Sequence, residues 1–244
     1  MMNDGPFSRT ERLIGAAALE KLKNARVAVF GIGGVGGAAT EALARAGVGH
    51  FLLVDKDVVD ITNLNRQIIA TVDTIGRPKT EVMKERILSV NPEADVECRQ
   101  CFFLPENAAE FDLSAFDYIV DAVDTVTAKL CIIEEARKAG VPVISAMGAG
   151  NKLDPSAFRV ADLYDTSVDP LAKVMRRECR KRGIGALKVV YSTEEPVTPA
   201  PQETDGEESS RRKDTPASIS FVPNAAGLVL AGAVVRELIG CGYS

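Results

Sequence analysis

A glycine-rich turn near the N-terminus constrains the fold of this chain more than any other feature of its sequence. A short apolar run, residues 27–30, ends in the stretch GIGGVG, and a helix-like pattern follows over residues 38–46. This order matches the GxGxxG fingerprint, in which glycines permit a tight turn and let backbone N–H groups approach phosphate oxygens at a helix N-terminus. The next apolar run ends in an acid at about the spacing of a ribose-binding carboxylate. The fingerprint and the acid predict a nucleotide site that includes Gly31, Gly33, Gly34, Gly36 and Asp55.

The fingerprint leaves the identity of the nucleotide open. A nicotinamide-dependent oxidoreductase is the default for such a turn, but it needs a catalytic acid or base for its substrate. His50 is the only histidine, and it starts a predicted strand, so we interpret it as a structural residue at the sheet end. A hydride carrier and ATP are both possible on this pattern alone.

Strand-like and helix-like segments alternate over residues 25–150, which predicts βαβ units and a parallel sheet. The predicted strands are residues 27–30, 50–54, 96–103, 118–123 and 141–146, and the predicted helices are residues 9–24, 38–46, 80–90 and 128–139. Beyond residue 150 we expect short strands at 158–164, 187–192 and 219–222, a basic helix at 171–182 and a closing helix at 225–239. The expected fold is α/β: a Rossmann-like, mostly parallel sheet with helices on both faces, plus a C-terminal extension with short antiparallel strands.

The composition excludes several classes of protein. Hydrophobic residues make up 46% of the 244, which suffices for a sizeable core, yet no apolar run approaches the ~20 residues of a membrane helix. We expect a cytoplasmic protein with no membrane partner, because a secretory signal is lacking and the five cysteines suit a reducing compartment. A net charge of −5 does not indicate nucleic-acid binding, although a local basic patch still can.

A second group of polar residues follows the predicted strands. The stretch DKDVVDITNLNRQ places Asp57, Asn63 and Arg66 just beyond the strand at 50–54, at the edge where doubly wound sheets bind ligands. Lys79 opens the next helix, where a cation opposes the helix dipole unless an anion lies nearby. The strand at 118–123 is followed by Asp124. Two cations and a metal-holding carboxylate are what cleavage of a triphosphate requires, because they neutralise the charge on the phosphates.

At these residues the chain resembles the adenylating enzymes related to the ubiquitin-activating, ThiF and MoeB proteins. GIGGVG, the D-x-D of Asp55 and Asp57, NLNRQ, GRPK and DAVD match that family in order and spacing over roughly residues 9–150. The resemblance implies a homodimer that uses ATP and Mg²⁺ to convert a carboxylate into an acyl-adenylate. By this resemblance, Arg12 is an arginine finger directed at the partner subunit, and Arg66 and Lys79 contact the phosphates. Asp124 holds the magnesium ion, and Asn63 is a further ATP contact. Asp121 has no counterpart in the family, and we expect it to be structural.

The cysteines separate this chain from two branches of the family. Sulfur-carrier activators typically hold zinc with two CxxC pairs, whereas this chain has one pair, Cys98 and Cys101, which strand alternation places on opposite faces. Arginines around Cys179 predict a lowered thiol pKa and suggest a thioester nucleophile. However, Cys179 shares a helical face with Leu171 and Met175, which favours packing. We therefore expect the substrate to be something other than a protein tail.

The C-terminal third resembles the tRNA threonylcarbamoyladenosine dehydratases of the TcdA or CsdL type, and extends the resemblance to nearly the whole chain. The matching segments are KLDPSAFRVADLYDTSVDPLAKVMRRECRKRG, VVYSTEEPV and FVPNAAGLVLAG. The resemblance implies that ATP adenylates the threonyl carboxylate of a modified adenosine in tRNA, and that attack from within the threonylcarbamoyl group then closes a ring. No enzyme cysteine or histidine is needed, because the substrate's own geometry supplies the nucleophile. A cysteine desulfurase sulfur-acceptor system is a further partner of that subfamily.

The predicted helix at 171–182 carries the candidate tRNA contacts. Residues 173–188 contain seven Lys or Arg and one Glu. Four of these cations share a helical face, which suits the phosphate backbone of RNA: Lys173, Arg176, Arg177 and Arg180.

We expect one ThiF-type domain over residues 1–244, with a helical arm at 1–24, a nucleotide-binding core at 25–150 and an extension at 151–244. The polar, proline-containing stretch 198–217 should be a flexible loop. Two alternatives for the function stay open. Adenylation of the C-terminus of a ubiquitin-like or sulfur-carrier protein predicts an acyl-adenylate on a diglycine tail, and a nicotinamide oxidoreductase or a nucleotide sensor predicts NAD affinity without pyrophosphate release.

Overall fold

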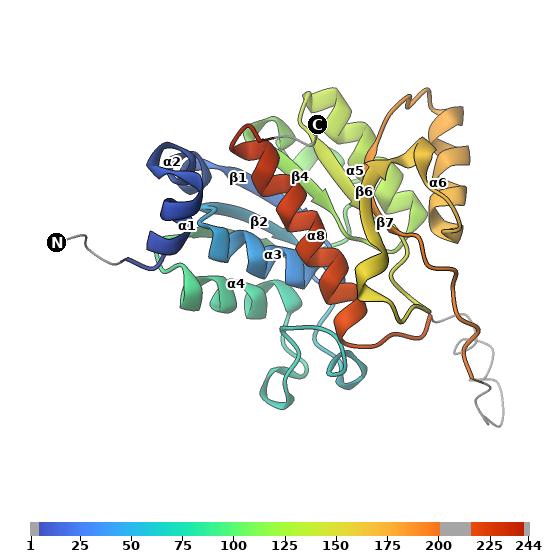
Figure 1. The fold of residues 1–244 in the computed structure, drawn as a ribbon, viewed down its shortest axis with the longest axis horizontal. Helices are drawn as coiled ribbons and strands as arrows, with labels where there is room; N and C mark the ends of the chain where they lie inside the picture. Colours follow the sequence, from blue (N-terminus) through green and yellow to red (C-terminus); the bar gives the residue numbers. More distant parts are fainter. Residues whose placement is uncertain (1–4, 201–215, 242–244) are drawn as a thin grey trace.

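A computed structural model of the chain describes residues 5–200 and 216–241, and its centre is a seven-stranded sheet in the order β3-β2-β1-β4-β5-β7-β6 (Figure 1). The strands are β1 (Arg26–Phe30), β2 (His50–Val54), β3 (Asp95–Arg99), β4 (Tyr118–Asp121), β5 (Val143–Ala146), β6 (Phe158–Asp162) and β7 (Lys188–Ser192). Neighbouring strands are parallel except for β6, which runs antiparallel to β7. The α/β prediction is confirmed, and the antiparallel pair extends the same sheet through β7.

Helices cover both faces of the sheet. They are α1 (Ser8–Ile14), α2 (Ala16–Asn24), α3 (Gly34–Ala46), α4 (Lys79–Val90), α5 (Val126–Ala139), α6 (Pro170–Lys181) and α8 (Phe221–Leu238). Alternate residues of β1 serve the two faces, as strand geometry requires. Val27 and Val29 join the core beneath α3, α4 and α8, whereas Ala28 and Phe30 join the core beneath α5. A third apolar cluster seats α6 against α5 and β7.

Helix α8 covers one face of the sheet and packs against α3 (Figure 1). A Cβ at Gly227 would lie 2.4 Å from Val35 O and 2.8 Å from Ala38 Cβ, so the two helices are in contact through bare backbone there. Among the residues that the structure describes, α8 alone has the length and hydropathy of a membrane span. Its inward side chains, among them Val222, Leu230 and Val234, are fully buried against α3 and the sheet, which is the packing of a core helix.

Several predicted boundaries were wrong for identifiable reasons. Residues 219–222 form no strand, because α8 begins at Phe221 and the proline at position 223 falls in its first turn, where a missing N–H leaves no bond unmade. The predicted helix at 9–24 is two helices that meet at Gly15, whose φ of 86° lies in the left-handed region. The strand predicted at 96–103 ends at Arg99. Most of the loop predicted at 198–217 lies outside the described residues.

A buried ion pair joins the centre of the sheet to α5. Lys129 Nζ lies 3.1 Å from Asp121 Oδ2 and donates to Ala146 O at 2.7 Å, and both side chains are fully buried. Ser145 Oγ donates a further bond to the same Asp121 oxygen. Asp121 therefore has the structural surroundings expected from its lack of a counterpart in the family.

We predict that Lys129→Met destabilises the protein by about 3–5 kcal/mol, because Asp121 then keeps a buried charge without a partner. Urea unfolding followed by circular dichroism measures the loss. A double variant, Lys129→Met with Asp121→Leu, removes both charges and should recover most of the stability. An equal loss in the single and double variants would assign the effect to packing and contradict the electrostatic explanation.

Candidate active site

A cavity of about 400 Å³ opens at the C-terminal ends of the central parallel strands. It lies where the strand order reverses between β1 and β4, the position at which open α/β sheets bind ligands. Nine of the residues predicted from the sequence line it: Gly31, Gly33, Gly34, Asp55, Asp57, Asn63, Arg66, Lys79 and Asp124. Segments far apart in the chain thus meet at one edge of the sheet.

The glycines of the turn divide into two groups. Gly31 has a φ of 89°, and a Cβ there would lie 2.6 Å from Ala122 O; a Cβ at Gly36 would lie 1.8 Å from Gly31 O. These two positions need glycine so that the turn can close against the end of β4. A Cβ at Gly33 would meet only Gln67 Nε2, at 3.9 Å, so packing within the protein does not require glycine there. Gly33 and Gly34 line the cavity with bare backbone, at the N-terminus of α3.

Asp55 holds the turn in place. Its Oδ2 accepts from Ile32 N at 2.6 Å, and its Oδ1 accepts from Asp57 N at 2.8 Å. Burial raises the pKa of Asp55, and the two backbone hydrogen bonds oppose that rise. The carboxylate predicted to bind a ribose therefore also fixes the loop that carries the glycines.

Lys79 is a buried cation in the first turn of α4. The residue is 6% exposed, and its Nζ lies 3.2 Å from Asp57 Oδ2. A backbone bond from Lys79 N to Asp57 O, of 3.0 Å, ties the helix start to the end of β2. Burial alone would raise the pKa of Asp57, but the ammonium groups of Lys79 and Lys56 together outweigh it, and the pKa lies below its ordinary value. Asp57 therefore compensates a charge that the helix dipole disfavours.

The NLNRQ stretch forms a short turn along another wall of the cavity. Asn63 Oδ1 accepts from Asp60 N at 3.1 Å and so caps the turn. Arg66 Nη1 donates to Thr62 O at 2.8 Å and to Asn65 Oδ1 at 3.0 Å, which holds the guanidinium at the rim. The sequence did not lead us to predict Gln67 as a site residue, although its place directly after the arginine in NLNRQ could have indicated it. Gln67 lines the cavity and is 7% exposed, and its Oε1 is buried with no partner among the described residues.

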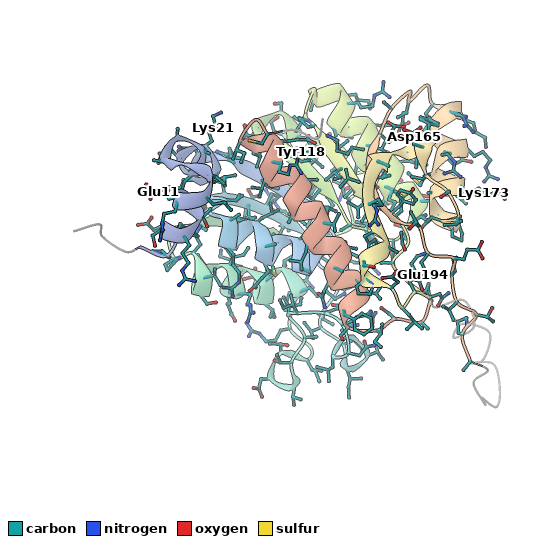
Figure 2. The ribbon with its side chains drawn as sticks, in the orientation of Figure 1. Glu11, Lys21, Tyr118, Asp165, Lys173 and Glu194 are labelled. Atoms are coloured by element: carbon teal, nitrogen blue, oxygen red, sulfur yellow. The ribbon has the colours of Figure 1, made fainter. Side chains whose placement is uncertain are left out.

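Three predicted residues lie outside the interior of the cavity. Gly36 is buried in the first turn of α3 and does not line the cavity. Asp124 is exposed at the mouth, between β4 and α5. Arg12 is exposed on α1, and α2 leads from there to the N-terminal end of β1, so Arg12 stands at the opposite edge of the sheet from the cavity. Figure 2 labels the neighbouring Glu11 and, at the other end of the molecule, Lys173 on α6. Arg12 does not reach the cavity of its own chain.

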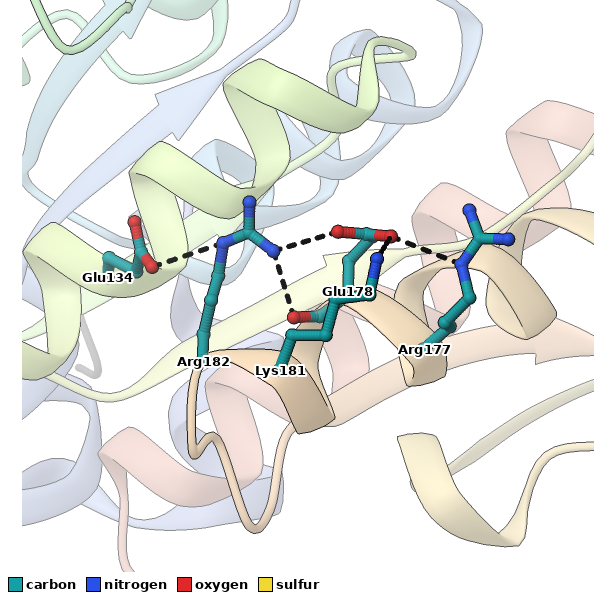
Figure 3. Close-up of polar contacts among 5 residues, drawn as sticks. All are labelled: Glu134, Arg177, Glu178, Lys181 and Arg182. Atoms are coloured by element: carbon teal, nitrogen blue, oxygen red, sulfur yellow. Dashed lines mark hydrogen bonds and ion pairs between the residues drawn. The ribbon is translucent and has the colours of Figure 1, made fainter.

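The basic helix α6 uses part of its charge internally. Glu178 accepts from Arg177 Nε at 3.1 Å, from Lys181 Nζ at 2.9 Å and from Arg182 Nη1 at 2.9 Å (Figure 3). The bonds from Lys181 and Arg182, more than that from Arg177, lower the pKa of Glu178 to about 2. Of the four predicted tRNA contacts, Arg177 is therefore shared with this glutamate.

The other predicted tRNA contacts differ in how exposed their side chains are and in how far other residues already bind them. Arg176 is half-buried and donates to Thr166 O at 2.9 Å. Arg180 is exposed and stacks over the ring of Tyr164 with 5.2 Å between guanidinium carbon and centroid. Lys173 is exposed and makes no ion pair with another described residue. Arg180 and Lys173 are thus the predicted contacts most available to a ligand.

The cysteines have different surroundings from those that a nucleophile needs. Cys179 is 0% exposed, and burial raises its pKa to about 11, so the prediction that nearby arginines lower this pKa was wrong. Cys98 packs on the core beneath α4 and Cys101 on the core beneath α5, which confirms that the pair faces opposite sides of the sheet. His50 starts β2, with Nδ1 3.6 Å from Asp95 Oδ2, at the edge away from the cavity.

Comparisons with known proteins agree with this architecture. The pattern that defines the ThiF family matches residues 7–244. A relative from Bacillus subtilis (strain 168), named tRNA threonylcarbamoyladenosine dehydratase, is 46% identical over 239 residues, which are 96% of this chain and 94% of the relative. The solved structure of the E. coli tRNA N6-threonylcarbamoyladenosine dehydratase, TcdA, in complex with ATP has a TM-score of 0.86 to this chain at 35% identity. The match covers 96% of this chain and 94% of that one. The complex of the same E. coli protein with AMP gives a TM-score of 0.86 at 36% identity and the same coverage. This chain therefore belongs to the ThiF family.

Proposed function

We propose that this protein catalyses the ATP-dependent dehydration of threonylcarbamoyladenosine in tRNA, through an acyl-adenylate of the threonyl carboxylate. The observation that carries the proposal is the cavity. Bare glycine backbone, two cations and an exposed carboxylate meet there, in a chain that matches dehydratases along nearly its whole length. This inventory suits phosphate chemistry. Cys179 is buried away from the cavity, and burial raises the pKa of Cys101, the one described cysteine that lines it.

The residues divide the reaction between them. Gly33 and Gly34, with the N-terminus of α3, hold phosphate oxygens, and Asp55 receives the ribose. A threonyl carboxylate oxygen attacks the α-phosphorus, and pyrophosphate leaves. Lys79 and Arg66 neutralise the charge that develops on these groups.

The second step needs no further enzyme group. The carbamoyl group attacks the activated carbonyl from within the same side chain and the ring closes. AMP departs with the former carboxylate oxygen, and an N–H proton of the carbamoyl group passes to solvent. Intramolecular attack of this kind is fast because orientation is fixed in advance. The net change in the nucleoside is the loss of one water.

Mg²⁺ fits the cavity as an ion carried by the nucleotide. The structure offers one exposed carboxylate at the mouth, Asp124, and no cluster of three metal-ligating side chains among the described residues. Magnesium in nucleotide enzymes characteristically binds phosphates, water and one or two carboxylates, so Asp124 suffices as the protein ligand. When bound, the ion neutralises phosphate charge.

The position of Arg12 supports a homodimer. Because Arg12 lies at the opposite edge from its own cavity, its proposed contact with phosphate requires another subunit. Apolar side chains exposed between β2 and α4, including Ile61 at 65% and Val72 at 76%, supply a surface that a second copy could cover. A cytoplasmic location and an association with a cysteine desulfurase system stay predictions.

The tRNA proposal rests on the outer face of α6. The hydrogen bonds to Glu178 occupy some of the N–H donors of Arg177, Lys181 and Arg182. They do not cancel the positive charge of the helix, because one carboxylate faces three cations. The face keeps a net positive field, and Lys173 and Arg180 remain accessible to RNA phosphates.

The decisive experiment is nucleoside mass spectrometry of tRNA that carries threonylcarbamoyladenosine, incubated with the protein, ATP and Mg²⁺. ATP-dependent loss of one water from the nucleoside supports the proposal. An unchanged nucleoside, with a preparation that binds ATP, contradicts it. Pyrophosphate exchange with a sulfur carrier, or NAD binding without pyrophosphate release, would then support the corresponding alternative.

We predict that Lys79→Ala lowers turnover at least ~10²-fold, because a charge aimed at the reacting phosphates is lost. Asp124→Asn should instead raise the magnesium concentration needed for half-maximal rate. Lys84→Ala removes a cation from the same helix outside the cavity and is the matched control. Steady-state kinetics with a magnesium titration measures all three variants. Near-normal kinetics in Lys79→Ala would remove that residue from the mechanism.

We predict that Arg12→Ala and Arg66→Ala are each inactive alone but regain activity when mixed. A mixed dimer contains one cavity with both an intact Arg66 and an Arg12 from the other subunit, so about a quarter of wild-type activity is expected after random exchange. Activity of the mixture against each parent is the measurement. A mixture as inactive as its parents, with exchange verified by mass, would rule out donation between subunits.

We predict that Arg180→Gln weakens tRNA binding and reduces the slope of log K against log salt by about 1, because one phosphate contact is lost. Arg176→Gln removes an equal charge, but its guanidinium is held by Thr166, so its salt slope should stay close to that of the wild type. Filter binding over a series of salt concentrations compares the two. Identical slopes in Arg180→Gln and the wild type would leave α6 as a solvated face.

A further inference from the structure

Asn151 joins two distant parts of the chain at the rim of the cavity. Its backbone N–H donates to Ala217 O at 2.8 Å, and its Oδ1 accepts from Ala217 N at 2.7 Å. Its carbonyl accepts from Val197 N at 2.7 Å. One residue therefore holds both Val197 and Ala217, which flank positions 198–216 in the sequence.

The segment that contains Ala217 forms one wall of the cavity. We call residues 216–220 the strap; it leads into α8, and two of its members, Pro216 and Ser218, line the cavity beside Gly150. Asn65 Nδ2 donates to Ser218 O at 3.0 Å, which ties the strap to the NLNRQ turn. The strap, which runs into the start of α8 (Figure 1), thus contacts both the segment after β5 and the turn after β2.

The junction has a backbone that only a few residue types accept. Asn151 has a φ of 57°, in the left-handed region, where asparagine is the most tolerated residue after glycine. A Cβ at Gly150 would lie 2.5 Å from Pro216 Cβ, so the strap lies directly on the backbone there. The close contact at Gly150 and the left-handed backbone of Asn151 together fix the strap against the segment after β5.

The loop that carries Asn151 is fixed independently of the strap. Glu194 (labelled in Figure 2) accepts from Leu153 N at 2.9 Å and from Asp154 N at 2.9 Å through its two carboxylate oxygens. Lys152 is buried and donates to Glu194 O at 2.8 Å. The position of Asn151 is therefore set by the contacts of its own loop with Glu194 and does not depend on the strap.

The sheet order places this wall relative to the nucleotide. Asp55 lies at the end of β2, the glycine turn at the end of β1, and Gly150 with the strap beyond the end of β5. The cavity therefore extends across the strand ends in the order β2, β1, β4, β5. A nucleotide with its ribose at Asp55 and its phosphates at the turn leaves the β5 end for the group that attacks the α-phosphate.

We infer that Asn151 is a positioning residue, which holds the strap as the wall that receives the threonylcarbamoyl side chain of the tRNA substrate. The inference rests on the proposed function for the identity of that group. The wall orients the acyl group, so its displacement impairs use of tRNA and leaves ATP binding intact.

Three substitutions separate the elements of this junction. Asn151→Gly keeps the left-handed backbone and removes the Oδ1 acceptor, whereas Asn151→Asp retains an acceptor at the same place. Gly150→Ala leaves Asn151 unchanged and forces Pro216 away. We expect kcat/KM for threonylcarbamoyladenosine tRNA to fall about tenfold in Asn151→Gly and Gly150→Ala, with the Kd for ATP within about twofold of wild type. Asn151→Asp should restore most of the tRNA activity.

Hydrogen exchange of the Ala217 amide tests the junction without any reaction. Asn151→Gly should accelerate this exchange at least about tenfold, and Asn151→Asp should not. Unchanged exchange, or wild-type tRNA kinetics in Asn151→Gly, overturns the inference, as does an equal loss of ATP and tRNA binding. If wild-type protein leaves the nucleoside unchanged, the proposed function fails, and the exchange result still decides whether Asn151 holds the strap.

Discussion

The close contact between the end of β1 and the end of β4 is the constraint on which this architecture depends. Gly31 lies so near Ala122 O, and Gly36 so near Gly31 O, that neither position accommodates a β-carbon. The chain must turn sharply there, and the turn places the N-terminus of α3 at the reversal point of the sheet. The carboxylate of Asp55 then secures the turn through Ile32 N. These contacts leave the bare backbone of Gly33 and Gly34 as part of the cavity lining.

Charge in the site is arranged in pairs that tolerate burial. Lys79 occupies a helix start that repels it, and Asp57 compensates at 3.2 Å. Beneath the site, Lys129 and Asp121 form a second pair that is fully buried and has further hydrogen bonds to Ser145 and Ala146. Loss of Asp57 would leave Lys79 as a buried charge without this partner, and loss of either Lys129 or Asp121 would leave the other buried and unpaired. Arg66, held at the rim by Thr62 O and Asn65, is exposed enough to meet a ligand.

Features that depend on local backbone geometry were predictable from the sequence. The glycine turn, the acids after β2, and Lys79 at the start of α4 all lie where their spacing indicated, because parallel strands bring their C-terminal ends to one edge. Features that depend on distant neighbours were not. The engagement of Arg176 by Thr166, the raised pKa of Cys179 and the orphan oxygen of Gln67 follow from tertiary packing. The apolar residues at 219–222 resemble a strand locally, but α8 extends into them because its apolar face continues against α3.

The glutamate at the centre of α6 has a consequence for how the molecule responds to its surroundings. Three cations surround Glu178 and lower its pKa to about 2, so its carboxylate stays ionised well below neutral pH. Arginine and lysine keep their protons over the same range. The outer face of α6 therefore behaves as a surface of constant charge. Mild acidification leaves the charge on these groups unaltered, whereas the concentration of surrounding ions tunes how far their potential reaches.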